Sequence, residues 1–410
     1  MEENQKVLTR NWEKVDPKEI TSYRKVGGYE VLQRVLQMNP KDVIAEVSKS
    51  GLKGRGGGGF LTGKKWELTA SSNVDEKYFI CNLDESEPGT YKDRLLAENN
   101  PHQLIEGIII GSYAVGAKKA FLYVNGNFHL AQFLLERAIR QAYENHFLGE
   151  GIMGSEYSLE FELFIGAGAY ICGEETALIN SLEGNRGEPR KRPPYTSESG
   201  LFGKPTVVNN AETISSITWI LEHGGTKYSQ IGESGETGTK IFCVDGIVKN
   251  PGAYEVPMGT SVNDIIYKYA GGIVDGAEPW FAQIGGSAGV LVPFGTFGAI
   301  PAYPRASYVP IGSGAILVIS KNQDIKELML SWANFFQRES CGKCVPCREG
   351  TFRLRAIIER LKEGTFSKND KEDLENLIWT LDNTTFCAFG KFSVIALKDV
   401  LRYGFCEELK

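Results

Sequence analysis

The stretch Glu339-Ser340-Cys341-Gly342-Lys343-Cys344-Val345-Pro346-Cys347-Arg348-Glu349-Gly350-Thr351 contains three cysteines, each separated from the next by two residues. Three cysteines at this spacing can bind three corners of a cuboidal iron–sulfur cluster from one loop, and a fourth ligand must then come from elsewhere. Cys387 lies in the turn-like segment 384–390 and is a plausible donor. The pattern therefore predicts a four-iron cluster held by Cys341, Cys344, Cys347 and Cys387.

Two other interpretations of these cysteines remain open. A structural zinc ion also takes four cysteines, at tetrahedral geometry, and a disulfide would require an oxidising compartment. Zinc usually draws its ligands as two separated pairs, whereas here three cysteines share one loop, which favours the cluster. Because an iron–sulfur cluster accepts one electron at a time, the rest of the chain should supply those electrons.

The overall composition is that of an ordinary globular protein. The 410 residues are enough for two to four domains, and 42% are hydrophobic and 23% charged. The net charge of −6 provides no broad positive field to attract nucleic acid or anionic lipid. The N-terminal residues lack the apolar core of a signal peptide, and the most apolar helical candidate, 104–117, is too short to cross a bilayer. We therefore expect any membrane association to depend on a partner.

A run of glycines lies between Gly54 and Trp66. Such a run leaves backbone N–H groups uncovered, and the following segment can present a helix N-terminus to a phosphate. Arg55, Lys64 and Lys65 add positive charge. The run alone is a weak signal, because glycine-rich turns are common and no strong strand precedes it, as the strict dinucleotide pattern requires.

The first predicted strand covers residues 77–83, and an acidic turn follows it. Crowding Asp84, Glu85 and Glu87 together is costly without a ligand or a cation nearby, and ligands bind at the carboxyl ends of strands in open α/β sheets. A solvated acidic turn is the alternative.

Further strands are predicted over 118–125 and 159–165, with helices over 41–49, 101–115 and 130–144. Strands that alternate with helices predict a parallel, doubly wound sheet and an α/β fold.

A second glycine-rich loop, 166–178, follows the third strand and opens a helix. Its Tyr170 is placed to cover an aromatic ring or to hydrogen-bond to it. After a basic, proline-rich loop that ends in Tyr195, the adjacent Asn209 and Asn210 lead into another helix. One of them can simply cap that helix, and the sharper hypothesis is that both face a cofactor.

The pattern changes near residue 239. Short β segments with turn signals and one helix, 262–269, indicate a small α+β module that ends in a strand over 315–320. From residue 325 onward we predict helices over 327–336, 351–362 and 371–381, around the cysteine loop. Cys243 and Cys406 are predicted to be small buried residues.

Taken together, the stretches 54–66, 81–90, 166–178, 205–213 and 339–351 and the Cys387 turn resemble the flavin-bearing, NADH-binding subunit family of respiratory complex I. The resemblance covers nearly the whole chain past residue 50. It implies a Rossmann-like FMN domain, a ubiquitin-like β-grasp module and a C-terminal helical domain that carries a [4Fe-4S] cluster. The predicted boundaries are 1–75 for an N-terminal arm with the glycine-rich loop, 76–238 for the FMN/NADH domain, 239–322 for the β-grasp module and 323–410 for the iron–sulfur domain.

The resemblance also assigns ligand contacts. FMN is expected at the first glycine loop, the acidic turn and the asparagine pair, and NADH across the two glycine loops. The FMN residues are Gly54, Arg55, Gly56, Gly57, Lys65, Asn82, Asp84, Glu85, Ser86, Gly173, Glu174, Asn209, Asn210 and Thr213. The NADH residues are Gly57, Gly58, Phe60, Lys65, Glu87, Tyr170, Glu175 and Tyr195. Of these, Glu87 and Glu175 are the predicted catalytic residues.

The implied reaction is hydride transfer from the nicotinamide C4 to the flavin N5, followed by single-electron transfer to the cluster. The hydride itself needs no acid or base, so the protein orients the rings, sets the flavin potential and excludes water. Three positions differ from relatives: Gly58 stands where alanine is common, Leu68 where some have phenylalanine, and Tyr195 where phenylalanine is found.

The expected partners, again implied by the resemblance, are a small [2Fe-2S] subunit and a large multi-cluster iron–sulfur subunit, besides NADH. The expected location is cytoplasmic and peripheral, on the inner face of the membrane, with no direct membrane insertion and no nucleic acid. One alternative is the diaphorase subunit of an NAD-linked hydrogenase or formate dehydrogenase. An alternative of another class is a zinc-stabilised, non-catalytic scaffold.

Overall fold

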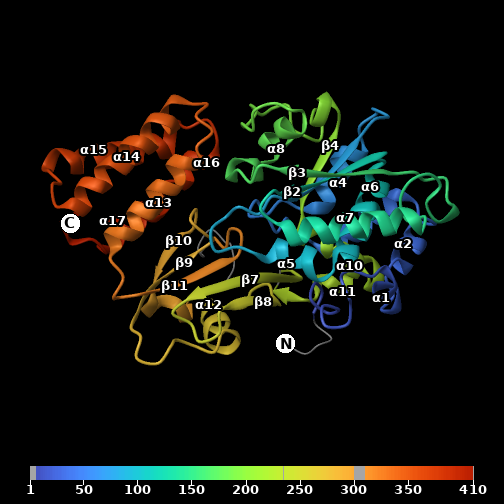
Figure 1. The fold of residues 1–410 in the computed structure, drawn as a ribbon, viewed down its shortest axis with the longest axis horizontal. Helices are drawn as coiled ribbons and strands as arrows, with labels where there is room; N and C mark the ends of the chain where they lie inside the picture. Colours follow the sequence, from blue (N-terminus) through green and yellow to red (C-terminus); the bar gives the residue numbers. More distant parts are fainter. Residues whose placement is uncertain (1–5, 234, 300–309, 410) are drawn as a thin grey trace. The chain divides into compact units, whose positions relative to one another are not determined.

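The computed structural model describes residues 6–233, 235–299 and 310–409, whose fold is drawn in Figure 1. The chain forms two compact units. The first comprises Met1–Ser86, Tyr91–Ile241 and Glu255–Gly259, and the second comprises Glu87–Thr90, Phe242–Tyr254 and Thr260–Lys410. The finer division into four parts, with boundaries after residues 75, 238 and 322, stays a prediction.

The first unit is built on a four-stranded parallel sheet with the order β3-β2-β1-β4. Its strands are β1 (Tyr78–Leu83), β2 (Lys119–Asn125), β3 (Glu160–Gly166) and β4 (Thr206–Asn210). The chain adds β2 and β3 on one side of β1 and then returns to place β4 on the other, where Cys81 pairs with Asn209. The predicted parallel, doubly wound sheet is confirmed. The order of strands reverses between β1 and β4, and that is where open α/β sheets bind their ligands.

The helix α6 (Pro101–Val115) is almost wholly buried. Asn100 caps its first turn, Pro101 occupies the first helical position, and Gly116 ends it in the left-handed conformation. The other helices of this unit are α1 (Ile20–Lys25), α2 (Glu30–Val35), α3 (Pro40–Ser50), α4 (Thr62–Ala70), α5 (Lys92–Asn99), α7 (His129–Glu144), α8 (Glu175–Leu182), α9 (Ala211–Ser215), α10 (Ile217–His223) and α11 (Gly225–Ser229). Short turns of 3₁₀ helix are η2 (Ile152–Gly154), η3 (Tyr170–Gly173) and η4 (Leu201–Gly203), and β5 (Gly232–Glu233) pairs with β6 (Glu236–Thr237).

The N-terminal segment, which the sequence indicates as a peripheral arm, is anchored by two carboxylates. Glu106 of α6 accepts a hydrogen bond from the Tyr23 hydroxyl at 2.6 Å and from the Tyr29 and Leu32 N–H groups at 3.0 Å each. Glu255 accepts the backbone N–H groups of residues 7, 8 and 9 and the hydroxyl of Thr239. The described part of the arm is therefore an integral part of the first unit.

The second sheet has the order β10-β9-β11-β7-β8 and is mixed. The strand β11 runs parallel to β7 and antiparallel to β9, and β9 pairs antiparallel with β10. A mixed sheet with a helical segment between β8 and β9 is the predicted β-grasp arrangement. Its elements are β7 (Thr239–Gly246), β8 (Gly252–Pro257), α12 (Val262–Asp264), η5 (Ile265–Tyr269), β9 (Pro279–Ile284), β10 (Val290–Pro293), η6 (Phe294–Ala299) and β11 (Ala315–Ser320). The stretch 300–309 of this module lies outside the described residues.

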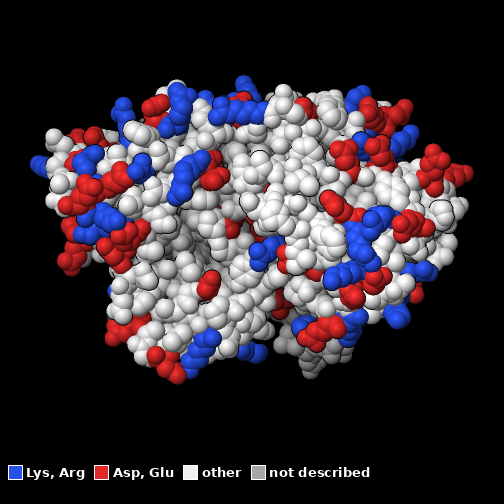
Figure 2. All heavy atoms as spheres, in the orientation of Figure 1, with Lys and Arg blue, Asp and Glu red and all other residues white. Residues whose placement is uncertain are grey.

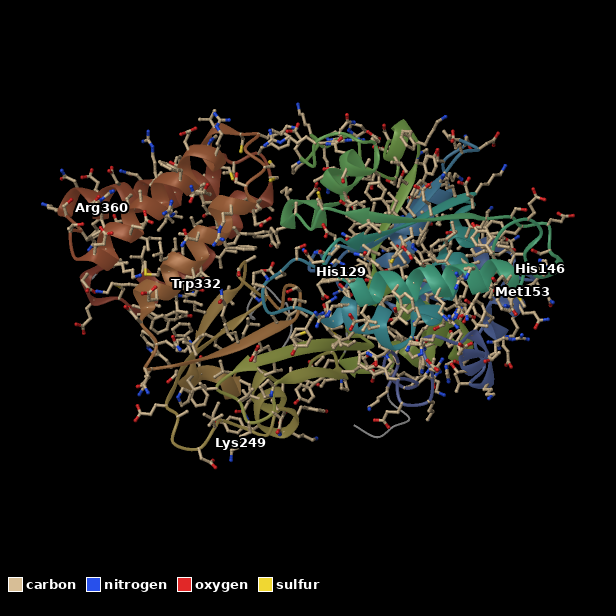
Figure 3. The ribbon with its side chains drawn as sticks, viewed as in Figure 1. His129, His146, Met153, Lys249, Trp332 and Arg360 are labelled. Carbon is tan, nitrogen blue, oxygen red and sulfur yellow. The ribbon has the colours of Figure 1, made fainter. Side chains whose placement is uncertain are left out.

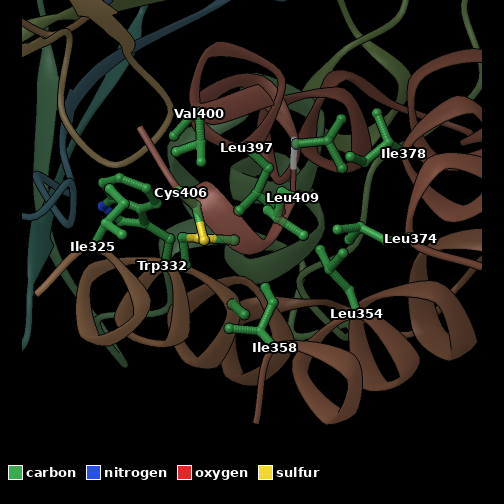
Figure 4. Close-up of a cluster of buried hydrophobic side chains, with 14 of the residues drawn as sticks. Ile325, Trp332, Leu354, Ile358, Leu374, Ile378, Leu397, Val400, Cys406 and Leu409 are labelled. Atoms are coloured by element: carbon green, nitrogen blue, oxygen red, sulfur yellow. The ribbon is translucent and has the colours of Figure 1, made fainter. Parts of the chain in front are cut away.

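The C-terminal helices pack around one hydrophobic cluster. They are α13 (Ile325–Glu339), α14 (Val345–Glu363), α15 (Lys368–Thr384), α16 (Ala388–Phe392), α17 (Ile395–Tyr403) and the turn η7 (Glu407–Leu409). Trp332, Leu354, Leu374 and Leu397 come from four of these helices and point toward one another (Figure 4). Cys406 lies in the same cluster, and Cys243 is buried in β7, as predicted. Burial of these apolar faces holds the helices together.

The described part of the chain has a surface of mixed charge. Charged side chains of both signs are interspersed over the face seen in Figure 2, in keeping with the small net charge. No helix among residues 6–233, 235–299 and 310–409 has the length and apolar character needed to cross a bilayer.

Candidate functional site

The first glycine loop is a closed turn with an uncovered backbone. The Gly54 N–H donates to the Phe60 carbonyl at 2.8 Å, which closes the loop, and residues 56–60 are exposed. Gly57 has a φ of 111°, which disfavours any other residue, and a Cβ on Gly58 would meet nothing within 4 Å. A Cβ on Gly56 would lie 3.1 Å from the Asn210 Cβ. The loop therefore packs closely against the end of β4 while its other side stays open.

Hydrogen bonds tie this loop and α4 to β4 and α9. The Arg55 N–H donates to the Thr213 hydroxyl at 2.8 Å, and the Lys65 ammonium donates to the Val208 carbonyl at 3.0 Å. The Trp66 indole donates to Asn209 Oδ1 at 2.8 Å. Arg55 Nε is buried and has no hydrogen-bond partner within the described ranges. A buried donor beside an open glycine loop suits an anionic ligand such as a flavin phosphate.

Asn210 has the capping role that the sequence left open. Its Oδ1 accepts the N–H groups of Glu212 and Thr213 at the start of α9, and its Nδ2 donates to Asp93 Oδ2 at 2.7 Å. The predicted flavin residues Arg55, Gly56, Lys65, Asn209, Asn210 and Thr213 thus come together at the carboxyl end of β4. Their contact with the flavin stays a prediction.

The acidic turn after β1 is ordered by hydrogen bonds. Asp84 is buried, and its backbone N–H donates to Asn82 Oδ1 at 2.9 Å, while Asn82 Nδ2 donates to the Gly173 carbonyl at 3.1 Å. Ser86 accepts a bond from Asn125 at 2.9 Å. A freely solvated turn does not describe these residues.

Glu87 differs from its neighbours because it belongs to the second unit. There its carboxylate accepts the backbone N–H of Ser287 at 2.6 Å. A Cβ on Gly286 would clash with the Glu87 side chain at 2.3 Å, so this carboxylate fits closely against the 285–288 turn.

The second glycine loop carries two carboxylates that meet two cations. Glu174 caps α8 by accepting the N–H groups of Thr176 and Ala177 at 3.0 Å each. Glu175 Oε2 pairs with Lys65 at 3.0 Å, and Glu175 Oε1 pairs with Arg192 at 3.1 Å. Arg192 also pairs with Glu174. Arg192 was not among the predicted site residues, and the basic loop in which it lies was the only signal for it.

Side chains within and after the two glycine loops are exposed. Phe60, Leu68 and Tyr195 are each between 44% and 55% exposed, and Tyr170 is half-buried. Exposed aromatic and apolar groups next to an open glycine loop offer surface on which a planar ligand ring can stack. Their contact with NADH stays a prediction.

A buried charge network lies behind the carboxyl ends of β1 and β4. Lys92 pairs with Asp93 at 2.8 Å and with Glu212 at 2.9 Å, and Lys240 pairs with Glu212 at 3.0 Å. All four side chains are at least 95% buried. Glu85 extends the network, because it accepts the backbone N–H groups of Asp93 and Arg94 at the start of α5. The sequence pattern did not reveal this network.

Burial and the neighbouring charges act in opposite directions on these groups. Burial lowers the pKa of Lys240 to about 8, although Glu212 acts to raise it. Burial opposes the charges of Lys92 and Glu212, yet their ion pairs raise the pKa of Lys92 and lower that of Glu212. Burial and the nearby Asp93 raise the pKa of Glu85 to about 7.

Glu212→Gln is expected to lower the free energy of unfolding by about 3–5 kcal/mol, because it leaves two buried ammonium groups with one carboxylate between them. Urea denaturation of the whole chain measures this change. Glu222→Gln is the matched control, since Glu222 forms an exposed pair with Arg10 and should contribute only about 0–1 kcal/mol. Equal losses in the two variants would contradict the prediction.

The cysteine loop leads directly into α14. Cys344 is the residue before that helix and Cys347 lies in its first turn, so the helix begins six residues earlier than predicted. Gly342 turns the loop with a φ of 73°, and the Arg348 guanidinium donates to the Gly342 carbonyl at 2.9 Å. The Lys343 ammonium lies 5.0 Å from the centre of the Phe386 ring, which joins this loop to the Cys387 turn.

The four predicted ligand cysteines lie close enough to interact electrostatically. Burial, together with the nearby Cys344, Cys387 and Cys341, raises the pKa of Cys347 to about 12, although a hydrogen bond with Ser340 at 3.3 Å acts to lower it. None of the eight cysteines, all of which lie among the described residues, is part of a disulfide. Four thiols in one place are costly to ionise without metal, so this group suits a cofactor that supplies positive charge.

Hydrogen bonds connect the helices that carry or flank the cysteines to their neighbours, and two of the residues involved, Trp332 and Arg360, are labelled in Figure 3. Trp332 of α13 donates to Gln283 of β9 at 3.2 Å, and Arg360 of α14 bonds to Asp370, which also forms a capping box with Ser367 at the start of α15. The Thr351 hydroxyl donates to the Cys347 carbonyl at 2.8 Å. These contacts hold the cysteine loop on rigid elements.

Family comparisons match three consecutive parts of the chain. Residues 47–219 match the Nuo51 FMN-binding domain, residues 241–287 an SLBB domain, and residues 327–410 the NADH-ubiquinone oxidoreductase-F iron-sulfur binding region. The glycine loops, the acidic turn and β4 fall in the first match, and all four ligand cysteines fall in the third.

Individual relatives agree with these matches. The NADH-quinone oxidoreductase-F protein of Aquifex aeolicus is 44% identical over 380 residues, which covers 90% of this chain and 86% of that protein. The NADP-reducing hydrogenase protein HndC of Solidesulfovibrio fructosivorans is 40% identical over 388 residues, which covers 94% and 79% respectively. The crystal structure of the NAD+-reducing [NiFe]-hydrogenase in the H2-reduced state superposes with a TM-score of 0.85 at 32% identity, covering 98% of this chain but 66% of that one.

The fold and its two sites define a flavoprotein that also carries an iron–sulfur cluster, and thus a subunit that links two-electron to one-electron chemistry. Its cofactors are FMN and a [4Fe-4S] cluster, so the zinc-scaffold alternative is wrong. The chain belongs to the NADH-quinone oxidoreductase-F family, and it works as one subunit of a larger complex.

Proposed function

We propose that this chain takes a hydride from NADH at its first unit and passes the electrons one at a time through its cysteine-bound cluster to other subunits, toward quinone. The observation that carries the proposal is the open glycine loop packed against the reversal point between β1 and β4, in a chain whose four cysteines gather at one place. FMN, when bound, supplies the conversion between hydride and single electrons.

The chain's own residues bind and orient the two ligands. Backbone N–H groups of residues 56–58 and the buried Arg55 side chain would hold the FMN phosphate, with Gly54 shaping the loop and Asn209, Asn210 and Thr213 beside the ribityl chain. Phe60, Tyr170 and Tyr195 would flank NADH, and Glu175 would meet its adenosine ribose. Glu87, in the acidic turn, would also contact the nucleotide. Cys341, Cys344, Cys347 and Cys387 would hold the cluster.

The proposed partners are a small [2Fe-2S] subunit and a large subunit with several iron–sulfur clusters. The proposal is supported by the match of residues 327–410 to the NADH-ubiquinone oxidoreductase-F iron-sulfur binding region, which includes all four predicted ligand cysteines. The proposed location is cytoplasmic and peripheral, on the inner face of the membrane, through contact with these partners.

The isolated chain, loaded with FMN and iron, is expected to show flavin and iron–sulfur absorbance that NADH bleaches. It should oxidise NADH with artificial one-electron acceptors but should not reduce quinone, because its cluster has no onward path. Stopped-flow absorbance and steady-state assays measure both reactions. Quinone reduction by the chain alone, unaffected by added partner subunits, would refute the proposed place of this chain in the complex.

A second candidate is the diaphorase subunit of a hydrogenase. The similarity to HndC and to the NAD+-reducing hydrogenase favours it. The chain spans 66% of the matched hydrogenase chain, so a third of that chain has no counterpart here. Purification of the native complex separates the candidates: hydrogen-dependent reduction of NAD+ would support the hydrogenase, and NADH-dependent reduction of quinone the respiratory complex.

A further inference from the structure

Two carboxylates share the N-terminus of α5, and their surroundings differ. Asp93 contacts one ammonium and one side-chain amide. The Lys92 Nζ lies 2.8 Å from its Oδ1, and Asn210 Nδ2 donates to its Oδ2 at 2.7 Å. The Glu85 carboxylate accepts hydrogen bonds from the backbone N–H groups of Asp93 and Arg94, each at 3.0 Å. Two neighbouring carboxylates in unlike environments separate into a charged partner and a proton-holding one.

Glu85 is also joined to the ends of the central strands. It follows β1 closely, its own carbonyl accepts a bond from Asn125 at the end of β2, and Asp93 connects it to Asn210 at the end of β4. These ends form the carboxyl edge of the sheet at the reversal point, within the matched FMN-binding domain. A charge that appears in the flavin pocket therefore arises close to Glu85, whose side chain is partly buried at this edge.

We propose that Glu85 is the residue that takes up a proton when the flavin site receives a hydride. Transfer of a hydride from NADH releases NAD+ and adds one negative charge to the pocket, and one proton from solvent binds the Glu85 carboxylate to balance it. When the two electrons leave through the cluster, the proton that arrived with the hydride and the proton on Glu85 both return to solvent. The inference rests on the proposed function, because it requires flavin at this edge of the sheet.

The sign of the effect follows from the charges that face Glu85. Asp93 and the added negative charge favour the protonated form of Glu85. The Lys92 ammonium and the backbone N–H of Arg94 favour the charged form. The pKa of Glu85 is already raised to about 7 by burial and Asp93. A further negative charge raises it again, so above pH 7 the reduced protein binds a proton that the oxidised protein lacks. The flavin potential then falls more steeply with pH in that range.

The test is a spectroelectrochemical titration of the FMN-loaded chain between pH 6 and 9, in the absence of NADH. For a two-electron couple, one additional proton steepens the slope by about 30 mV per pH unit. Glu85→Gln is expected to remove that increment above pH 7, and Glu85→Asp, which keeps a titratable group, should retain it. Glu106→Gln is the matched control, because Glu106 is a buried carboxylate with three donors from the N-terminal segment; its slope should equal that of the unmodified chain.

A second measurement covers the case in which Glu85→Gln loses its flavin. The reduced-minus-oxidised infrared difference spectrum of the unmodified chain at pH 8 should contain a carboxylic acid C=O band that shifts on 13C-glutamate labelling. Absence of the band, or equal slopes in the unmodified chain and Glu85→Gln, would overturn the inference. If either of these contrary results is obtained while NADH still bleaches the flavin, the Glu85 inference fails and the proposed function stands. If the unmodified chain binds no flavin, the inference and the proposed function both fail.

Discussion

Cys347→Ser is expected to stop electrons from leaving the chain while NADH still bleaches the flavin. Cys341, Cys344 and Cys387 are all near enough to raise the pKa of Cys347, and serine is a poor ligand for iron in a cluster. The cysteines and the glycine loops lie in separate units, so the flavin site should survive the change. In the assembled complex, NADH-dependent quinone reduction should fall by at least about a hundredfold, equivalent to about 2.7 kcal/mol of activation free energy.

Iron content, electron paramagnetic resonance and flavin bleaching report on the same samples. Cys406→Ala is the matched control, because Cys406 is a buried thiol of the same helical part that belongs to the hydrophobic core. That variant should lose some stability but keep its cluster and its quinone reduction. Normal quinone reduction in Cys347→Ser would show that electrons leave by another route.

Glu175→Gln is expected to let NADPH compete with NADH. A carboxylate about 5 Å from one charge of a 2′-phosphate, at an effective dielectric constant of about 20, disfavours it by about 3 kcal/mol. That energy corresponds to roughly a hundredfold in kcat/KM. Lys65 and Arg192 already offset part of the Glu175 charge, so we expect the NADPH-to-NADH ratio of kcat/KM to rise by tens of times rather than the full amount.

The same ion pairs suggest where the gain would come from. In Glu175→Gln, Arg192 and Lys65 lose an anionic partner and can bind the 2′-phosphate instead. Adding Arg192→Gln should therefore reduce the gain by about tenfold. Glu174→Gln is a control, because glutamine can still accept the N–H groups that Glu174 caps, and its effect should be smaller. A change in the ratio below about threefold for Glu175→Gln, which is under 1 kcal/mol, would exclude Glu175 as the discriminating charge.

The sequence allowed the prediction of elements whose signal is local. The helix α6 agrees at both ends with its predicted range, since Asn100, Pro101 and Gly116 mark its limits in the chain itself. The strands β1, β2 and β3 lie within one residue of their predicted ranges. The strand β4 was missed, because five residues between a proline and a helix cap carry too little periodicity. Its position beside β1 nevertheless decides where the ligand edge lies.

The site was predictable as far as single loops reveal it. Glycine runs, the acidic turn and the cysteine spacing all lie within short stretches, and they led to the flavin and cluster residues. Lys92, Asp93, Glu212 and Lys240 are spread over some 150 positions and meet only in the folded chain. Arg192 and Glu175 are likewise separated along the chain and pair only once it is folded. A buried ion pair between distant segments has no local pattern, so only the fold can reveal it.

The hydrogen bonds between Glu255 and the N-terminal segment constrain the order in which the chain can fold during synthesis. Its carboxylate holds the backbone of Val7, Leu8 and Thr9, nearly 250 positions earlier. The ribosome releases the N-terminus first, so these residues must wait, without their final partner, until Glu255 has emerged. The first unit therefore closes late in translation, after its parallel sheet is complete. Its nascent form, with the start of the chain still loose, is the species that chaperones and proteases would meet in the cell.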